Sequence, residues 1–212
     1  TLALAATEPG LSLGVFKMTG IAPHDLLEHM TLGAELTAAE SHQLEKVRAR
    51  VRRMAQFAAK SGRTLMIDAE ETWIQGAIDQ LAREAMQEFN RDRLVIMTTI
   101  QCYRVGRQAQ LRADLDHASA HGYFYGVKLV RGAYMEKERE RAQKMNYTSP
   151  IHVSKADTDN EYNQALKLCV ENIQRISICA GTHNEESSQY LVDLMEEHNI
   201  AAFHPHIFFA QL

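Results

Sequence analysis

The sequence has few cysteines, few prolines and no long apolar run, and each scarcity excludes a class of protein. Its three cysteines, Cys102, Cys169 and Cys179, form no C-x-x-C pair, so we expect neither a disulfide scaffold nor a structural zinc site. No segment approaches the roughly 20 apolar residues that span a bilayer. Four prolines and eleven glycines in 212 residues are too few for a low-complexity chain. An ordinary globular domain remains.

An excess of basic residues is also missing. The chain has 23 Lys and Arg against 27 Asp and Glu, a net charge of -4, which predicts no nucleic-acid partner. It contains neither G-x-G-x-x-G nor a P-loop motif, so a classical dinucleotide or P-loop site is not expected. The N-terminal Thr-Leu-Ala-Leu-Ala-Ala has no initiator methionine and no basic region of a signal peptide. We therefore expect the chain to be part of a longer protein.

The chain is built from short apolar runs, rich in β-branched residues, that alternate with longer segments of helical spacing. The strand-like runs are residues 11–18, 64–68, 94–101, 124–130, 175–180 and 207–210. They lack the polar alternation of half-exposed strands, which is typical of parallel strands buried on both faces. Among the helical segments, Thr37 and Glu40 predict a capping box.

The strand-like runs begin roughly every thirty residues, and no linker interrupts them. Repeated strand–helix units predict a parallel α/β fold, with residues 1–212 forming one domain. A closed barrel needs about eight such units, and six are visible here. The periodicity by itself fits both a doubly wound sheet and a TIM barrel.

Polar residues gather where the predicted strands end. They are Lys17, Asp68 and Gln101 after the first three runs, Lys128 and Arg131 at the fourth, Thr182 and His183 after the fifth, and Gln211 at the sixth. A barrel builds its active site from the carboxyl ends of successive strands, whereas a doubly wound sheet concentrates it near one switch point. The distribution therefore favours the barrel.

Several of these residues also fit a purely structural role. Asp68 and Glu71 fit a helix N-cap with its capping-box partner, and His183 fits a cap of the helix that follows it. Gln101 fits a satisfied core amide. Lys128 is different, because it interrupts the apolar strand Gly-Val-Lys-Leu-Val, where a charge is costly unless it faces a polar cavity or a partner.

Four motifs in order resemble those of the proline dehydrogenase family. They are Ile-Asp-Ala-Glu-Glu at 67–71, Thr-Ile-Gln-Cys-Tyr at 99–103, Lys-Leu-Val-Arg-Gly-Ala-Tyr at 128–134 and Gly-Thr-His-Asn at 181–184. Val-Phe-Lys-Met-Thr at 15–19 is similar to the family's lysine-bearing strand. Each motif alone is weak, but four in register are specific. The sequence of the third motif is closer to the corresponding motif of the mitochondrial enzymes and their bacterial relatives than to that of the large bifunctional enzymes.

The resemblance implies a distorted (β/α)8 TIM barrel, with about six of its eight units in this chain. It implies non-covalently bound FAD and oxidation of L-proline to Δ1-pyrroline-5-carboxylate by hydride transfer to flavin N5. A quinone is the implied electron acceptor. The implied location is the mitochondrion in a eukaryote, or the cytoplasm or inner-membrane surface in a bacterium, with a peripheral membrane association.

The matched motifs also imply roles for individual residues. The implied cofactor-binding residues are Gln101, Lys128, Val130, Gly132, Ala133, Lys155, Thr182 and His183. Gln101 and Lys128 bond the isoalloxazine, with Lys128 near N5. Val130, Gly132 and Ala133 offer backbone groups, and the last three residues serve the pyrophosphate and adenosine half.

On the substrate side, the resemblance implies that Lys17 pairs with the proline carboxylate, Asp68 organises the pocket and Tyr134 shapes it. Asp68 and Lys128 are the implied catalytic residues, and no metal site is implied. The family also carries two adjacent arginines on its last helix, in a Tyr-Leu-x-Arg-Arg-x-x-Glu-Asn motif, and this sequence does not contain them. We expect the chain to be truncated at both ends and inactive without that helix.

Three alternatives stay open at the level of sequence. The first is dehydrogenation of 4-hydroxyproline, which the absent helix would be expected to discriminate. The second is a metal-dependent barrel lyase or isomerase that uses Asp68, Glu70, His183 and His206 as ligands. The third is a catalytically silent barrel fragment that acts as an interaction subunit.

Overall fold

The computed structural model describes residues 13–211, which divide into two compact units. The first contains the residues up to Thr98 together with 122–124, and the second contains 99–121 and the residues from Tyr125 onward. The N-terminal six residues and the first two residues of the strand expected at 11–18 lie outside the described residues.

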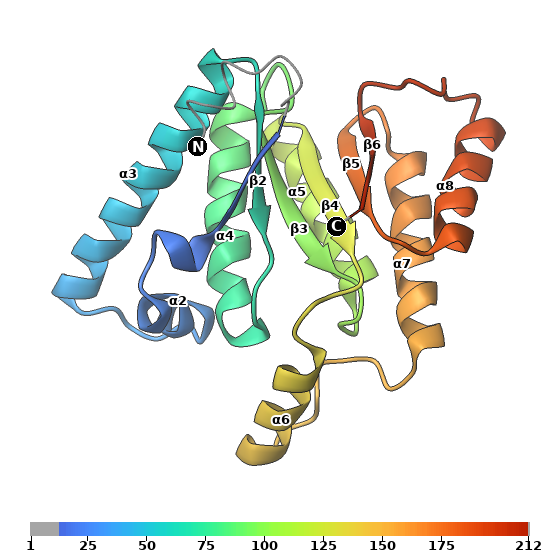
Figure 1. The fold of residues 1–212 in the computed structure, drawn as a ribbon. Helices are drawn as coiled ribbons and strands as arrows, with labels where there is room; N and C mark the ends of the chain where they lie inside the picture. The colour runs from blue at the N-terminus through green and yellow to red at the C-terminus, as the bar shows by residue number, and fades with distance from the viewer. Residues whose placement is uncertain (1–12, 212) are drawn as a thin grey trace. The chain divides into compact units, whose positions relative to one another are not determined.

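Each unit is built of alternating strands and helices (Figure 1). The first unit contains β1 (Leu13–Lys17), η1 (Met18–Gly20), α2 (His24–Thr31), α3 (Ala38–Lys60), β2 (Thr64–Asp68), α4 (Thr72–Phe89) and the start of β3 (Ile96–Gln101). The second contains the end of β3, α5 (Arg107–His121), β4 (Tyr125–Val130), α6 (Met135–Met145), α7 (Lys155–Glu171), β5 (Ile176–Gly181), α8 (Glu185–Glu197) and β6 (Ile207–Ala210).

The strands pair in the order in which they occur in the chain. In the first unit β1 pairs with β2 and β2 with β3, both in parallel. In the second unit the residue after β3 bonds to the last residue of β4, with 2.7 Å from the Cys102 nitrogen to the Val130 oxygen, and β4, β5 and β6 pair in parallel. The order of the described strands is therefore sequential, as in a barrel, whereas a doubly wound sheet reverses its order at a switch point.

The predicted strands are confirmed, two of them with the expected bounds. β2 and β6 span residues 64–68 and 207–210, and the described ends of the others differ from the expected ends by one or two residues at most, which is the usual uncertainty of strand and helix ends. β3 is buried throughout, as expected for a strand covered on both faces. β4 departs from this pattern at Lys128 and Val130, which are only half-buried.

The helix caps confirm one prediction and correct two. The Thr37–Glu40 capping box is present: the Glu40 nitrogen donates to Thr37 Oγ1 and the Thr37 nitrogen donates to Glu40 Oε2, at 3.2 and 2.8 Å. Asp68 does not cap α4, because it is still in β2, in register with Lys17. The N-cap of α4 is Glu71, which makes no side-chain cap bond.

The structural alternative for His183, a cap of the helix that follows it, is also wrong. Asn184 caps α8, and its side-chain oxygen accepts from the Ser187 nitrogen at 2.8 Å. His183 thus precedes the helix and has an exposed side chain.

The long gap between the fourth and fifth predicted strands holds two helices. α6 projects beyond the end of β4, whereas α7 runs beside α8 (Figure 1). Within residues 13–211, none of the helices combines the length and the apolar character needed to cross a bilayer.

Candidate functional site

Lys128 and Val130 extend from the same face of β4, because they are two residues apart in a strand. Gly181, at the end of β5, leaves room for both of them. A Cβ atom at Gly181 would lie 3.0 Å from Val130 Cγ1 and 3.7 Å from Lys128 Cγ. Lys128 is also in register with Cys179, whose thiol has its pKa raised by burial against the opposing effect of the Lys128 charge. The Lys128 stem therefore lies over the carboxyl end of β5.

Gln101 ends β3 and faces the turn that follows β4. Its side chain is 3 % exposed, and its Oε1 accepts a hydrogen bond from the Ala133 nitrogen at 3.4 Å. The amide is thus part of the interior, as its structural interpretation predicts. It also contacts the motif that carries Lys128.

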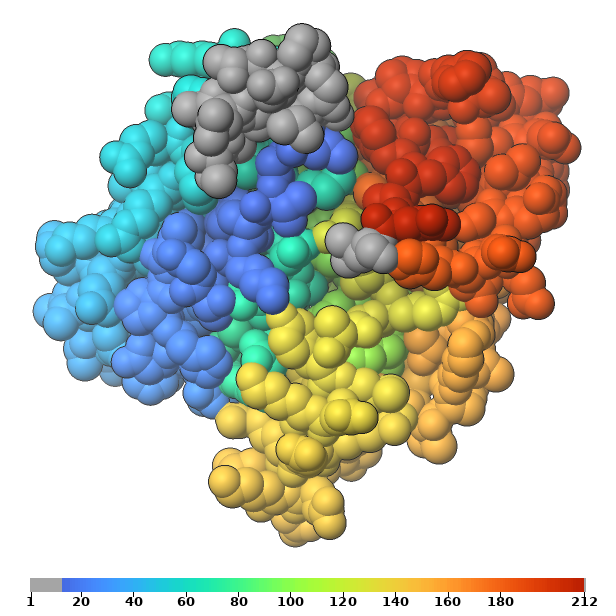
Figure 2. All heavy atoms as spheres, viewed as in Figure 1, coloured from blue at the N-terminus to red at the C-terminus, as the bar shows by residue number. Residues whose placement is uncertain are grey.

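The turn after β4 has an unusual backbone. Gly132 has a φ of +140°, a conformation that side-chain-bearing residues rarely adopt. Gly132 and Ala133 are exposed, so backbone groups of this turn are accessible. Figure 2 shows residues that follow β4, in yellow, at the surface of the molecule.

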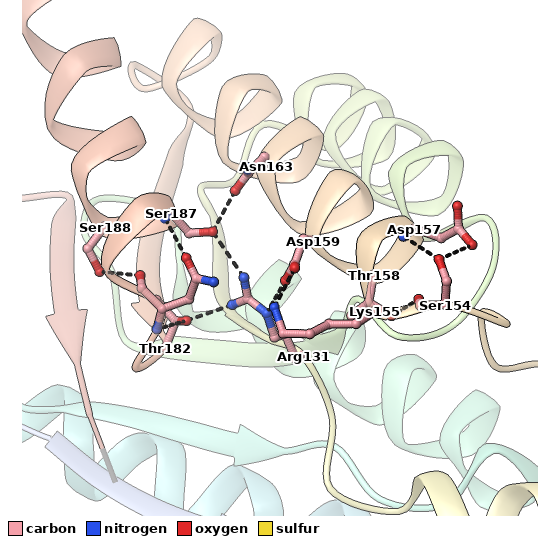
Figure 3. Close-up of polar contacts among 11 residues, drawn as sticks. Arg131, Ser154, Lys155, Asp157, Thr158, Asp159, Asn163, Thr182, Ser187 and Ser188 are labelled. Atoms are coloured by element: carbon pink, nitrogen blue, oxygen red, sulfur yellow. Dashed lines mark hydrogen bonds and ion pairs between the residues drawn. The ribbon is translucent and has the colours of Figure 1, made fainter.

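Arg131 connects three segments of the second unit (Figure 3). Its Nε donates to Asp159 Oδ1 at 2.7 Å, its Nη1 to Thr182 Oγ1 at 2.6 Å and its Nη2 to Ser187 Oγ at 3.0 Å. The guanidinium also lies 4.6 Å from the centre of the Tyr162 ring, within range of a cation–π contact. Arg131 therefore ties the end of β4 to α7 and to the start of α8.

Lys155 and Thr182 belong to this same network. Lys155 Nζ donates to Asp159 Oδ2 at 2.5 Å, so the Asp159 carboxylate lies between two cations. Burial acts to raise the pKa of Asp159, but the hydrogen bonds from Lys155 and Arg131 outweigh it and the pKa falls below its ordinary value. Thr182 Oγ1 accepts from Arg131 and also from the Asn184 nitrogen, the latter at 3.0 Å.

The sequence alone predicts no role for Arg131 beyond its place at a strand end, and none for Asp159 or Ser187. One local signal was present, because Lys155 and Asp159 are four residues apart on a helix and such pairs commonly meet. The other contacts join residues 28, 51 and 56 positions apart in the chain. No local pattern reports contacts of that separation.

In the first unit, the expected substrate-side residues are neighbours at the carboxyl ends of two strands. Lys17 and Asp68 are paired in the register of β1 and β2. The loops that follow these strands are joined through Glu70, which accepts from the Thr19 nitrogen at 3.0 Å and from Thr19 Oγ1 at 2.5 Å. Gln75 Oε1 accepts from the Glu70 nitrogen at 2.7 Å. The Glu70 carboxylate therefore holds the two loops together through its bonds to Thr19.

The histidines of the metal alternative do not meet. His206 Nδ1 lies 2.7 Å from Ser177 Oγ, near the start of β5, whereas His183 follows the end of that strand. Within residues 13–211, no group of three or more His, Cys, Asp or Glu side chains is arranged to hold a metal ion.

Comparison with known proteins identifies the family. The family model for proline dehydrogenase matches residues 5–212. This chain belongs to the proline dehydrogenase family. The family includes the human protein "Proline dehydrogenase 1, mitochondrial", which is 31 % identical over 182 residues, covering 84 % of this chain and 30 % of the human protein.

A second proline dehydrogenase relative is the "Hydroxyproline dehydrogenase" of Xenopus laevis. It is 33 % identical over 181 residues, which are 84 % of this chain and 39 % of the frog protein. The chain thus spans well under half the length of either relative.

Solved structures carry the same fold. Proline utilization A from Bdellovibrio bacteriovorus, in its form inactivated by N-propargylglycine, superposes with a TM-score of 0.81 at 20 % identity, covering 93 % of this chain and 20 % of that one. The predicted α/β fold, a (β/α) barrel of which residues 13–211 carry six strands, is confirmed.

Proposed function

We propose that this chain is the greater part of a flavin-dependent dehydrogenase barrel that oxidises L-proline to Δ1-pyrroline-5-carboxylate and passes the electrons to a quinone. The observation that carries the proposal is the convergence of three family motifs in the second unit. Gln101, Lys128 and Thr182 stand at the carboxyl ends of β3, β4 and β5, where a barrel places its active site.

The donors in the second unit suit FAD. The ammonium of Lys128, which is a half-buried residue, the amide of Gln101 and the exposed Gly132 match a flat ring edged with nitrogen and oxygen acceptors. The ring of Tyr103 occupies one side of Gly132, but the residue is exposed, so a ring system can approach its backbone from the other side. Val130, two residues before this glycine, and Ala133, directly after it, contribute backbone groups.

FAD, when bound, supplies the acceptor for the hydride that leaves the proline ring carbon next to nitrogen. Lys128 stabilises the negative charge that develops on the ring system during reduction, because a fixed cation in a water-poor site acts more strongly than one in bulk water. Gln101 orients the ring by hydrogen bonding. Proline must donate its hydride as the free amine, so the pocket has to favour the unprotonated nitrogen.

The pyrophosphate half falls to Lys155, Thr182 and His183. Thr182 and His183 lie just before Asn184, the N-cap of α8, and the amino end of a helix attracts anions through its dipole. Arg131 fixes Thr182 there through a 2.6 Å hydrogen bond. Lys155 adds an exposed ammonium beside Asp159.

The substrate side falls to Lys17, Asp68 and Tyr134. Lys17 pairs with the proline carboxylate, and Asp68, its neighbour in register, orients the ring nitrogen. Tyr134 shapes the pocket. We further propose that residues 1–212 belong to one barrel domain, and that the protein acts at a membrane surface, which is mitochondrial in a eukaryote.

The test is an absorbance spectrum of the full-length protein before and after anaerobic addition of L-proline. A yellow protein that bleaches supports the proposal. Lys128→Met is expected to lower kcat/KM for proline by about 10²-fold or more, the usual effect of removing one preorganised charge-stabilising group. Lys128→Arg retains the charge with altered hydrogen-bond geometry and is expected to retain part of the activity.

The matched control is Lys167→Met, which removes an exposed lysine from α7. It should leave both the spectrum and kcat/KM unchanged. A colourless full-length protein would exclude the proposal. So would a wild-type protein whose bound flavin is reduced neither by L-proline nor by 4-hydroxyproline.

A second candidate activity is oxidation of 4-hydroxyproline, which the name of the frog relative, "Hydroxyproline dehydrogenase", supports. The two activities are separated by kcat/KM for L-proline against trans-4-hydroxy-L-proline in the full-length enzyme. A ratio that favours the hydroxylated substrate would replace the first candidate with the second.

A further inference from the structure

The ring of Tyr103 occupies the space where Gly132 has no side chain. A Cβ atom at Gly132 would lie 2.5 Å from Tyr103 Cδ1 and Cε1 and 2.6 Å from Cζ, far inside van der Waals contact. Tyr103 is 3 % exposed, so the ring cannot move away into solvent. The face of a buried aromatic ring thus lies directly against the backbone of the turn.

Main-chain hydrogen bonds hold Tyr103 in place on both sides. The Tyr103 nitrogen donates to the Arg131 oxygen and the His152 nitrogen donates to the Tyr103 oxygen, each at 2.7 Å. The preceding residue, Cys102, donates to the Val130 oxygen at the same distance. Tyr103 is therefore attached to the turn after β4 by its backbone and supports the turn with its ring.

The hydroxyl of Tyr103 contributes less than the ring. Within the part of the chain that the structure describes, it makes no hydrogen bond of good geometry, although the backbone of Tyr134 lies near it. Burial, followed by the nearby negative charge of Glu138, raises the pKa of Tyr103, so the phenol stays neutral. Contact with Gly132 comes from ring carbons, which leaves the hydroxyl dispensable for it.

We propose that Tyr103 is a positioning residue that sets the backbone of residues 130–133 through its ring face, and through this turn sets the affinity and the redox environment of the flavin. The inference rests on the proposed function, because the flavin is the ligand that the turn is proposed to hold. In this proposal Tyr103 does not contact the cofactor itself; it supports the backbone that does.

The experiment compares Tyr103→Phe and Tyr103→Ala in the full-length protein. The readouts are the FAD dissociation constant, the midpoint potential of the bound flavin, and hydrogen exchange of residues 130–134 in flavin-free protein. Tyr103→Phe keeps the ring, and its FAD affinity should stay within about twofold of wild type. Tyr103→Ala should weaken FAD binding by about tenfold or more, shift the potential and speed exchange in the turn.

Tyr125→Ala is the matched control. Tyr125 is also buried in the second unit, but it begins β4, so its ring lies at the end of the strand away from the turn. Its loss should lower stability while leaving the FAD affinity and the flavin potential of the folded protein near wild type. Equal effects of the two alanine variants on FAD binding would overturn the inference.

A double substitution tests the contact directly. Gly132→Ala should weaken FAD binding strongly, both because its Cβ meets the Tyr103 ring and because of its positive φ. In a Tyr103→Ala background the steric part is gone, so the added loss from Gly132→Ala should shrink. Strictly additive losses would contradict the proposed contact. If Tyr103→Ala does not fold, Tyr103→Leu takes its place in the same comparison.

The outcomes separate the two proposals. If the wild-type protein binds no flavin, the proposed function fails and this inference fails with it. If the wild type binds flavin and all Tyr103 variants bind it equally well, only the inference about Tyr103 is overturned.

Discussion

At the scale of the single residue, Asn90 shows how one buried side chain joins separate segments of the first unit. Its Oδ1 accepts from the nitrogens of Val95 and Ile96 at 3.0 and 2.8 Å. Its Nδ2 donates to the oxygens of Ile96 and Phe124 at 2.8 and 2.9 Å. An amide can make two bonds through each of these atoms, so its hydrogen-bonding capacity is satisfied in full.

Asn90→Ala is therefore expected to lower the free energy of unfolding by about 3–5 kcal/mol, because it leaves several buried backbone groups without partners. Urea unfolding of the purified protein measures this. Asn172→Ala is the comparison, since Asn172 Nδ2 makes a single bond, 2.8 Å to the Leu168 oxygen, and its loss should cost about 1 kcal/mol. Similar losses for the two variants would show that the four bonds of Asn90 carry little stability.

Individual residues also show how much of the candidate site could be predicted from the sequence. The end-of-strand positions of Gln101, Lys128 and Thr182 were predictable, because strands of this length can be recognised from composition. Arg131 was not assigned a role, since its partners at Asp159, Thr182 and Ser187 come together only after the chain has folded. The roles of all these residues in catalysis and cofactor binding stay predictions.

At the scale of the element, α3 begins where its sequence predicts and α4 does not. The Thr37–Glu40 box is a contact between residues three apart, and its geometry depends on the first turn of one helix. The start of α4 depends on how far β2 continues, and this is set by the pairing of Asp68 with Lys17. An N-cap motif is therefore reliable only where no strand competes for its first residue.

The α3 cap predicts a pH dependence. The side-chain hydrogen bond from Thr37, followed by its backbone bond and that of His29, lowers the pKa of Glu40 from 4.5 to about 2. A carboxyl group with a depressed folded-state pKa stabilises the protein above its unfolded-state pKa, and this contribution is lost as pH falls toward the folded-state value. Between pH 4.5 and about 2, stability should therefore fall more in wild type than in Glu40→Gln.

Urea midpoints of the two proteins at pH 5 and pH 3 measure this difference. Glu45→Gln, on an exposed turn of the same helix, controls for a general loss of one carboxylate. Parallel pH profiles for wild type and Glu40→Gln would contradict the predicted role of the cap.

At the scale of the whole molecule, the proposed function predicts that flavin binding stabilises the second unit more than the first. A ligand that binds only the native state stabilises it by about 2.7 kcal/mol at a concentration a hundredfold above its dissociation constant. The proposed cofactor residues lie in the second unit, from Gln101 to His183. Local protection is therefore expected there.

Saturating FAD is expected to raise the melting temperature of the full-length protein and to slow hydrogen exchange in peptides covering 101–103, 128–134 and 182–187. Peptides from α3, in the first unit, serve as an internal reference and should change little. Riboflavin, which lacks the adenosine diphosphate half, should protect 182–187 less than FAD does. Protection confined to α3, or identical protection by both ligands, would argue against the proposed cofactor orientation.

The amino-acid sequence by itself determined the alternation of strands and helices, the α3 cap and the family motifs, because each depends on residues close together in the chain. Tertiary structure decided how these pieces meet: the Arg131 network, the four bonds of Asn90 and the fit of Tyr103 against Gly132. Each of these joins residues from different elements. These contacts form only after folding has buried the elements against one another. The spacing of hydrophobic residues predicts local secondary structure, but it does not specify which distant residue a polar side chain contacts.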